Sequence, residues 1–69
     1  MKNRPVVHAP YSKFKGFLRE QGLSYRDIAD LIGVTVSTVS MKVNGYSDFY
    51  LSETEAIKSK YNVERDIFC

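Results

Sequence analysis

The chain has 69 residues and a hydrophobic fraction of 43%, with four Phe and five Tyr, which is enough for one small core. Its single cysteine, Cys69, excludes an internal disulfide and a cysteine-based metal cluster, and it makes a reducing environment the natural setting. No apolar run approaches the ~20 residues that a membrane span requires, and the N-terminus lacks the apolar core of a signal peptide. We expect a soluble, intracellular protein with one domain.

The net charge of +2 is unevenly distributed along the chain. Residues 1–20 contain one acid, Glu20, against five basic residues, Lys2, Arg4, Lys13, Lys15 and Arg19. From residue 46 onward the acids outnumber the bases, five to three. The distribution indicates that a polyanion would meet the N-terminal half, and ordinary solvated surface charge is the alternative interpretation.

Residues 1–10, MKNRPVVHAP, contain two prolines and no helical period, which predicts a flexible N-terminal arm before a domain over residues 11–69. Lys2 and Arg4 are placed to reach a phosphate or a minor groove, as the basic arms of DNA-binding domains do. A terminus without function is the alternative, and Val6-Val7 packed against the domain is a third arrangement.

The first helix is expected from Tyr11 or Ser12 to Gln21, followed by a C-terminal glycine at Gly22. Its apolar residues recur at helical spacing and predict one buried face, made of Tyr11, Phe14, Phe17 and Leu18. These aromatic residues are interpreted as core and not as a platform on which bases stack.

A second helix is predicted to begin after Ser24, because Ser24 is a favourable N-cap and Asp27 stands three residues later, as in a capping box. Its apolar residues Ile28, Leu31 and Ile32 fall on one face. Gly33 is expected to end it in a left-handed conformation.

A third helix is predicted to begin after a second N-cap, Thr35, and to stop at Asn44-Gly45. Its apolar stripe consists of Val36, Val39 and Val43. Since only three residues separate these two capped helices, they must cross at a steep angle. The pattern is typical of a helix-turn-helix.

With small Ala29 in the first helix of the pair, Gly33 in the turn and Val39 in the second, this segment resembles the helix-turn-helix of phage Cro and repressor proteins. The resemblance extends from about Tyr11 to Phe68 and so covers nearly the whole chain. It implies the lambda-repressor-like DNA-binding fold, an all-α compact bundle of four to five short helices.

One position departs from the family pattern. The family often has an apolar residue where Lys42 stands, and here the apolar residue follows one position later, at Val43. The departure bears on the rotation of the second helix of the pair, and therefore on which of its side chains project outward.

After Gly45, Phe49 and Leu51 are expected to turn inward from a loop. Ser52 and Glu55 have the spacing of a complete capping box, which predicts a helix from Glu53 to about Tyr61. Its inward residues would be Ala56, Ile57 and Tyr61. The last seven residues, VERDIFC, are expected to form one short helical turn that returns Val63, Ile67 and Phe68 to the core.

The sequence contains no catalytic grouping, no phosphate-cradling glycine loop and no metal-ligand spacing, so we expect neither an enzyme nor a bound cofactor. His8 stands without a second His, a Cys or a pair of carboxylates, and it is interpreted as neither a metal ligand nor a base. Two binding hypotheses remain.

The first hypothesis is sequence-specific binding of double-stranded operator DNA. The family resemblance places the base-reading positions on Val36, Ser37, Ser40 and Met41, where the apolar pair would contact thymine methyl groups and the serines would hydrogen-bond. Candidate phosphate contacts are Tyr25, Thr38, Lys42, Asn44, Lys13 and Lys15. A homodimer on the operator is an open arrangement.

The second hypothesis arises because the predicted reading face has no Arg, Gln or Asn, the residues that grip guanine or adenine with two hydrogen bonds. The same fold would then serve as an antirepressor that docks onto another repressor protein, with Val36 and Met41 at the protein interface. Under either hypothesis, a phage or prophage origin would place the protein in the cytoplasm of a bacterial host.

Overall fold

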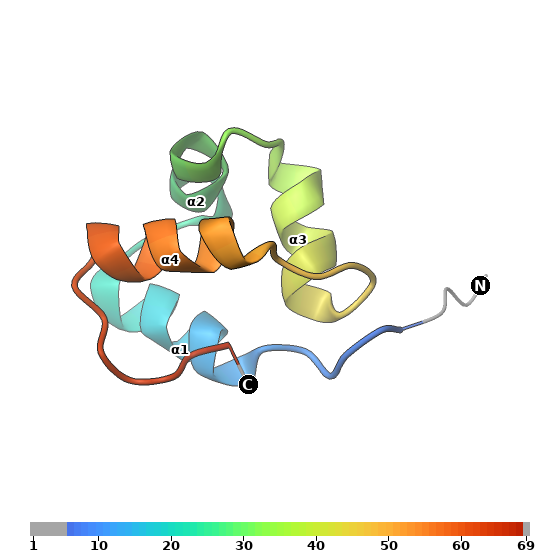
Figure 1. Cartoon of the computed structure of the whole chain (residues 1–69), viewed down its shortest axis with the longest axis horizontal. Coiled ribbons are helices and arrows are strands. Elements are labelled where there is room, and N and C mark those ends of the chain that lie inside the picture. Colours follow the sequence, from blue (N-terminus) through green and yellow to red (C-terminus); the bar gives the residue numbers. More distant parts are fainter. Residues whose placement is uncertain (1–5, 69) are drawn as a thin grey trace.

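The computed structural model describes residues 6–68 and, over that range, contains four α-helices and no strand. The helices are α1 (Ser12–Gln21), α2 (Tyr25–Ile32), α3 (Val36–Asn44) and α4 (Leu51–Lys60). In Figure 1, α4 crosses the front of the molecule between α1 and α2, and α3 stands at the end where residues 6–10 (blue) approach it. The radius of gyration of 11.6 Å describes a compact globule, and the all-α prediction is confirmed.

The predicted caps of α2 and α3 form as the sequence indicates. The Ser24 Oγ accepts the Asp27 amide, and the Asp27 carboxylate accepts the Ser24 amide at 2.8 Å, which completes the capping box. The Thr35 Oγ1 accepts the Thr38 amide at 3.2 Å. Gly33 has a φ of 76° and ends α2, so only residues 33–35 connect α2 to α3.

One hydrophobic core joins all four helices and the C-terminal tail. All six fully buried side chains at its centre were predicted to face inward. They are Phe14, Ile28, Val39, Val43, Ile57 and Ile67. Phe14, Phe49 and Phe68 pack ring against ring, with centroids 5.0–5.8 Å apart. Ile32, predicted on the buried face of α2, is half-buried at the edge of this core.

Lys42 occupies an inward position of α3. Its side chain is buried, and its ammonium lies 2.7 Å from a carboxylate oxygen of Glu53 at the start of α4. The ammonium also lies 4.6 Å from the centroid of the Tyr50 ring. Lys42 and Val43 therefore both face the interior.

The start of α4 differs from the prediction. The helix begins at Leu51, and the amide that is capped belongs to Tyr50 and donates to Glu53 Oε1 at 2.9 Å. The predicted Ser52–Glu55 box is therefore wrong, because the acid at the third helical position is Glu53, which Lys42 holds in place. Leu51, predicted to turn inward, is 73% exposed.

The C-terminal tail returns to the core without forming a helical turn. Asn62 has a φ of 55° after α4, and residues 63–68 are not helical. The predicted turn is wrong, whereas the predicted burial of Ile67 is confirmed and Val63 and Phe68 pack against the core. An extended chain spans about twice the distance per residue of a helix, so these few residues suffice to run from α4 back along α1 (Figure 1).

Residues 6–10 lie against the C-terminal end of α3. The Val7 amide donates to the Gly45 carbonyl at 2.7 Å, and the Tyr11 amide donates to the Val43 carbonyl at 3.0 Å. The side chains of Val6 and Val7 are exposed. Lys2 and Arg4, the predicted basic residues of the arm, lie outside the described residues.

The buried positions lead to a first prediction. Ile28→Ala and Val39→Ala should each lower the free energy of unfolding by about 2–4 kcal/mol, because each leaves a cavity at a fully buried site. The measurement is urea denaturation followed by circular dichroism. Val36→Ala, at an exposed position of the same helix as Val39, is the control and should change stability by less than about 0.5 kcal/mol. Core variants as stable as the parent would contradict this packing.

The buried ion pair leads to a second prediction. Glu53→Gln should destabilise the protein by about 3 kcal/mol or more, because it leaves the Lys42 ammonium buried without a counter-charge. The double variant Lys42→Met/Glu53→Gln should recover most of that loss, since the buried charge is then removed. Glu20→Gln breaks the exposed pair with Arg65, whose side chains are 60% and 58% exposed, and should cost about 1 kcal/mol at most. Equal losses from Glu53→Gln and Glu20→Gln would show that burial of Lys42 carries no energetic weight.

Candidate nucleic-acid interface

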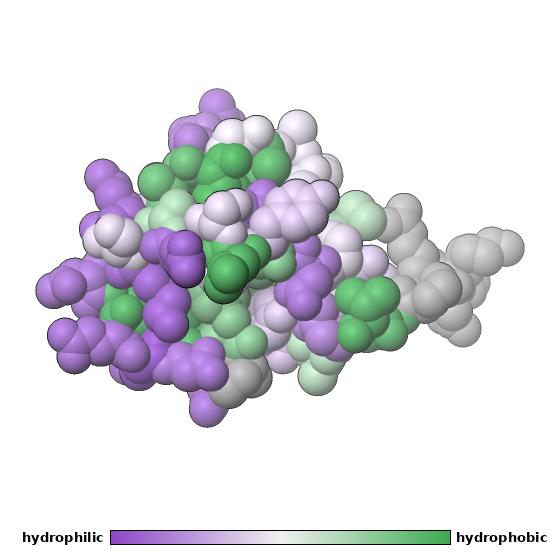
Figure 2. Space-filling view, viewed as in Figure 1, coloured by the Kyte–Doolittle hydropathy of each residue, from purple (hydrophilic) through white to green (hydrophobic). Residues whose placement is uncertain are grey.

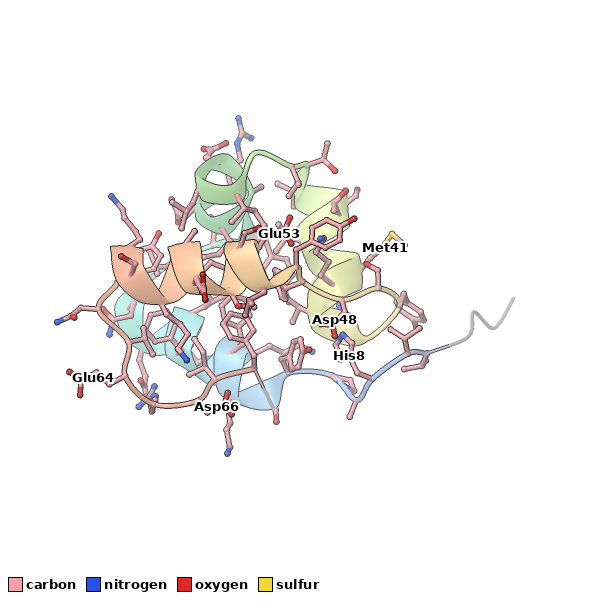
Figure 3. All side chains as sticks on the ribbon, viewed as in Figure 1. His8, Met41, Asp48, Glu53, Glu64 and Asp66 are labelled. Atoms are coloured by element: carbon pink, nitrogen blue, oxygen red, sulfur yellow. The ribbon has the colours of Figure 1, made fainter. Side chains whose placement is uncertain are left out.

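The side of α3 opposite its buried stripe carries three of the four predicted base-reading residues, Ser37, Ser40 and Met41. Val36 is 41% exposed and Ser37 is exposed, while Ser40 and Met41 are half-buried. In Figure 3, Met41 extends from the outer edge of α3, away from α4. Because Val39, Lys42 and Val43 point inward, the 3.6-residue repeat places Ser37, Ser40 and Met41 together on the outward side. Val36, predicted in the apolar stripe with Val39 and Val43, lies at the edge of that stripe and is exposed in the first turn of the helix.

Two of the predicted phosphate contacts are tied to their neighbours on the same helix. Thr38 Oγ1 lies 2.9 Å from Thr35 Oγ1 at the N-terminus of α3. The Asn44 side-chain amide donates to the Ser40 carbonyl at 2.8 Å and to the Ser40 hydroxyl oxygen at 3.3 Å. Since the Ser40 oxygen accepts this bond, its own proton remains free to be donated outward.

Lys42 has no place in such an interface. Its ammonium is enclosed by Glu53 and Tyr50, and 6% of the residue is exposed, so the structure removes it from the predicted phosphate contacts. As a result, the outward side of α3 exposes no charged side chain.

The structure separates the two lysines that the sequence analysis grouped together. Lys15 lines a shallow depression between α1 and the start of α2, with Arg19, Ser24 and Tyr25. Among the described residues neither Lys15 nor Arg19 takes part in an ion pair. Two cations, a serine and a tyrosine therefore surround the start of α2, and Tyr25, a predicted phosphate contact, is one of them.

Lys13 lies elsewhere, in a depression lined by Phe17 and by the charged residues Glu20, Arg65 and Asp66. A separation of two residues along an α-helix rotates the side-chain direction by about 200°. Lys13 and Lys15 therefore point to different sides of α1. Arg19, four residues after Lys15, shares its side of α1. The i, i+4 spacing of Lys15 and Arg19 is visible in the sequence, and it would have grouped Arg19, and not Lys13, with Lys15.

Large apolar side chains are exposed around α3 and beyond it. They belong to the residues before α1, to α3, to the loop that follows it and to the start of α4, namely Val6, Val7, Val36, Tyr46, Tyr50 and Leu51. Figure 2 shows hydrophilic side chains gathered at the opposite end of the molecule, where α4 finishes. The molecule therefore has one end rich in charge and another, containing α3, that is largely uncharged.

The described residues thus offer an uncharged helix face and a separate cationic depression at the start of α2. None of their helices is long and apolar enough to cross a bilayer. The chain matches none of the family models, curated proteins or solved structures with which it was compared.

Proposed function

We propose that the protein is a small sequence-specific DNA-binding transcriptional regulator in which α2 and α3 act as a helix-turn-helix. In this proposal the outward side of α3 enters the major groove of operator DNA, and α2 lies across the phosphate backbone. Occlusion of the operator is the simplest regulatory outcome for a domain of this size.

The observation that carries the proposal is the outward side of α3, where Ser37, Ser40 and Met41 lie together, with Val36 exposed at the N-terminal end of the helix. This side begins at the N-terminal end of the helix, the end that lies nearest the base edges when such a helix docks. The capped three-residue connection to α2 supports the same arrangement. The side chains suit thymine methyl groups and single hydrogen bonds to bases.

Phosphate contacts in the proposal come from the depression at the start of α2. Lys15 and Arg19 supply positive charge there, and Tyr25 and Ser24 supply hydroxyl groups. Since no charged side chain projects from α3, this depression provides the salt-dependent part of the affinity. The lack of a bidentate base contact predicts modest discrimination for one copy of the chain, which a homodimer on a two-part operator would increase.

A second candidate function rests on the exposed apolar residues. The same uncharged surface, with Val36 and Tyr46 each 41% exposed, is suited to a protein partner. An antirepressor that docks onto another repressor would use it. In that case α3 contacts protein and the depression at the start of α2 has no role.

The double variant Ser37→Ala/Met41→Ala distinguishes the two functions. If α3 reads bases, the double variant should lose at least about tenfold in affinity for a selected cognate duplex and much less for random duplex, since each specific contact contributes about 1–3 kcal/mol. The cognate site is first selected from a randomised duplex library, and affinities are then measured by fluorescence anisotropy. Equal losses on both duplexes would contradict base reading, and loss of binding to a partner repressor alone would support the antirepressor.

The cationic depression yields a separate prediction. Lys15→Ala and Arg19→Ala should each weaken binding to every duplex and reduce the slope of log K against log salt by about one unit, because each removes one phosphate contact. Lys13→Ala is the matched control, since Lys13 lies in the depression with Glu20 and Asp66, and it should leave the slope unchanged. An effect of Lys13→Ala equal to that of Lys15→Ala would move the phosphate contacts away from the start of α2.

A further inference from the structure

The chain contains one histidine, His8, and the fold holds it between the residues before α1 and the loop after α3. Its ring stacks on Tyr11, with centroids 4.1 Å apart and planes 20° apart. The side chain is 15% exposed. No local pattern in the sequence gives this residue a role, because its partners Ser47 and Asp48 come from the loop after α3.

Both ring nitrogens of His8 face backbone carbonyl oxygens. Nδ1 lies 2.6 Å from the Ala9 oxygen, and Nε2 lies 2.8 Å from the Ser47 oxygen. A carbonyl oxygen only accepts hydrogen bonds, and a neutral imidazole carries one N–H. The imidazolium form, with two, is the one that satisfies both contacts.

A carboxylate stands beside this ring. Asp48 Oδ1 lies 3.6 Å from His8 Nε2, and Figure 3 shows the two side chains adjacent. The same oxygen accepts the Tyr11 hydroxyl at 2.5 Å and the Phe49 amide at 2.8 Å. The carboxylate is thus fixed next to the position where the imidazolium charge would lie.

His8, Tyr11 and Asp48 together hold residues 6–10 against the end of α3. On either side of His8, the amides of Val7 and Tyr11 donate to the carbonyls of Gly45 and Val43. A Cβ added at Gly45 would lie 2.1 Å from the His8 carbonyl oxygen, so backbone meets backbone there. The Val6 side chain also reaches Gly45, but Val6 and Val7 are more than half exposed. His8 is the least exposed residue of this segment and its main side-chain anchor.

We propose that His8 is a pH-responsive latch that holds residues 6–10 on the C-terminal end of α3 when its ring is protonated and releases them when the ring becomes neutral. A neutral ring sets a nitrogen lone pair against a carbonyl oxygen and ends the attraction to Asp48. Release would uncover the backbone of Gly45, next to the outward side of α3. The latch does not depend on the DNA-binding proposal.

Other ionisable side chains lie around the ring. Asp48 faces it from the loop after α3 and Tyr11 from the start of α1. From α3, Lys42 presents its backbone carbonyl to the ring, and its ammonium is paired with Glu53.

The electrostatics favour the charged ring. Burial alone lowers the pKa of His8, but the hydrogen bonds to Ala9 and Ser47 and the charge of Asp48 outweigh it and raise the pKa above the ordinary 6.5. Burial likewise raises the pKa of Asp48, and the Tyr11 and Phe49 hydrogen bonds with the charges of His8 and Lys42 lower it overall. Because the pKa of His8 is raised in the folded chain, the contribution of the His8 ring to holding residues 6–10 in place is complete below pH 6.5. This contribution is lost as the pH rises through the raised value.

NMR spectroscopy of the full chain tests the latch, because the single histidine gives a single titration curve. The His8 ring should titrate above 6.5, and the exchange protection of the Val7 amide should decrease over the same pH range. Linkage requires the docking constant of residues 6–10 to fall about tenfold for each unit by which the pKa exceeds 6.5. The core amide of Ile28 should stay protected throughout.

Two variants complete the test. His8→Phe retains an aromatic ring against Tyr11 without ring N–H groups, and Val7 should be unprotected in it at every pH. Asp48→Asn retains an acceptor for Tyr11 and removes the charge, and the His8 titration should move down toward 6.5. A His8 titration at or below 6.5 in the parent would overturn the latch. Exchange protection of the Val7 amide that does not change with pH, or that persists in His8→Phe, would also overturn it.

Discussion

The buried ion pair between Lys42 and Glu53 joins the end of α3 to the start of α4, on the side of α3 that also buries Val39 and Val43. It places a charged side chain at an inward position and joins it, at 2.7 Å, to the carboxylate that also caps α4 through the Tyr50 amide. The end of α3 and the start of α4 are thereby fixed to one another. The outward position of Ser37 and Met41, and with it the proposed DNA contact, follows from this arrangement.

The two ends of the described chain are held by different interactions. Residues 6–10 depend on backbone hydrogen bonds to the end of α3 and on His8, whose favoured form is charged. The C-terminal tail depends on burial, since Ile67 is fully enclosed and the Phe68 ring stacks on Phe14. A change of pH should therefore act on the N-terminal segment and leave the tail in place.

Local signals were sufficient for the first three helices. The caps at Ser24 and Thr35 join residues at most four apart, and so do the hydrogen bonds of the glycine that ends each helix. The structure forms both as predicted. The periodicity of Val39 and Val43 likewise predicted the buried side of α3 and hence the outward one. Local patterns determine such features because few distant contacts compete with them.

The remaining features depend on residues far apart in the sequence. The ion pair with Lys42 holds Glu53 at the start of α4, so Glu53 is the capping acid of this helix although Ser52 and Glu55 also have capping-box spacing. Likewise, only the fold brings Ser47 into contact with His8. The tail follows the path back to α1, which no local pattern encodes. Lys13 differs in kind: helical geometry alone would have separated it from Lys15, so that correction was available from the sequence.

We propose that α3 and the start of α2 contact DNA together, and amide chemical-shift mapping would locate that contact residue by residue. A 15N-labelled sample of the full chain is titrated with duplex DNA at low salt. The largest shifts should fall on Ser37, Ser40 and Met41 and on Lys15 and Tyr25, while Lys13 and Arg65 should stay unchanged. Shifts confined to Lys13 and the α4 end of the molecule, or no shifts at any DNA concentration, would contradict it.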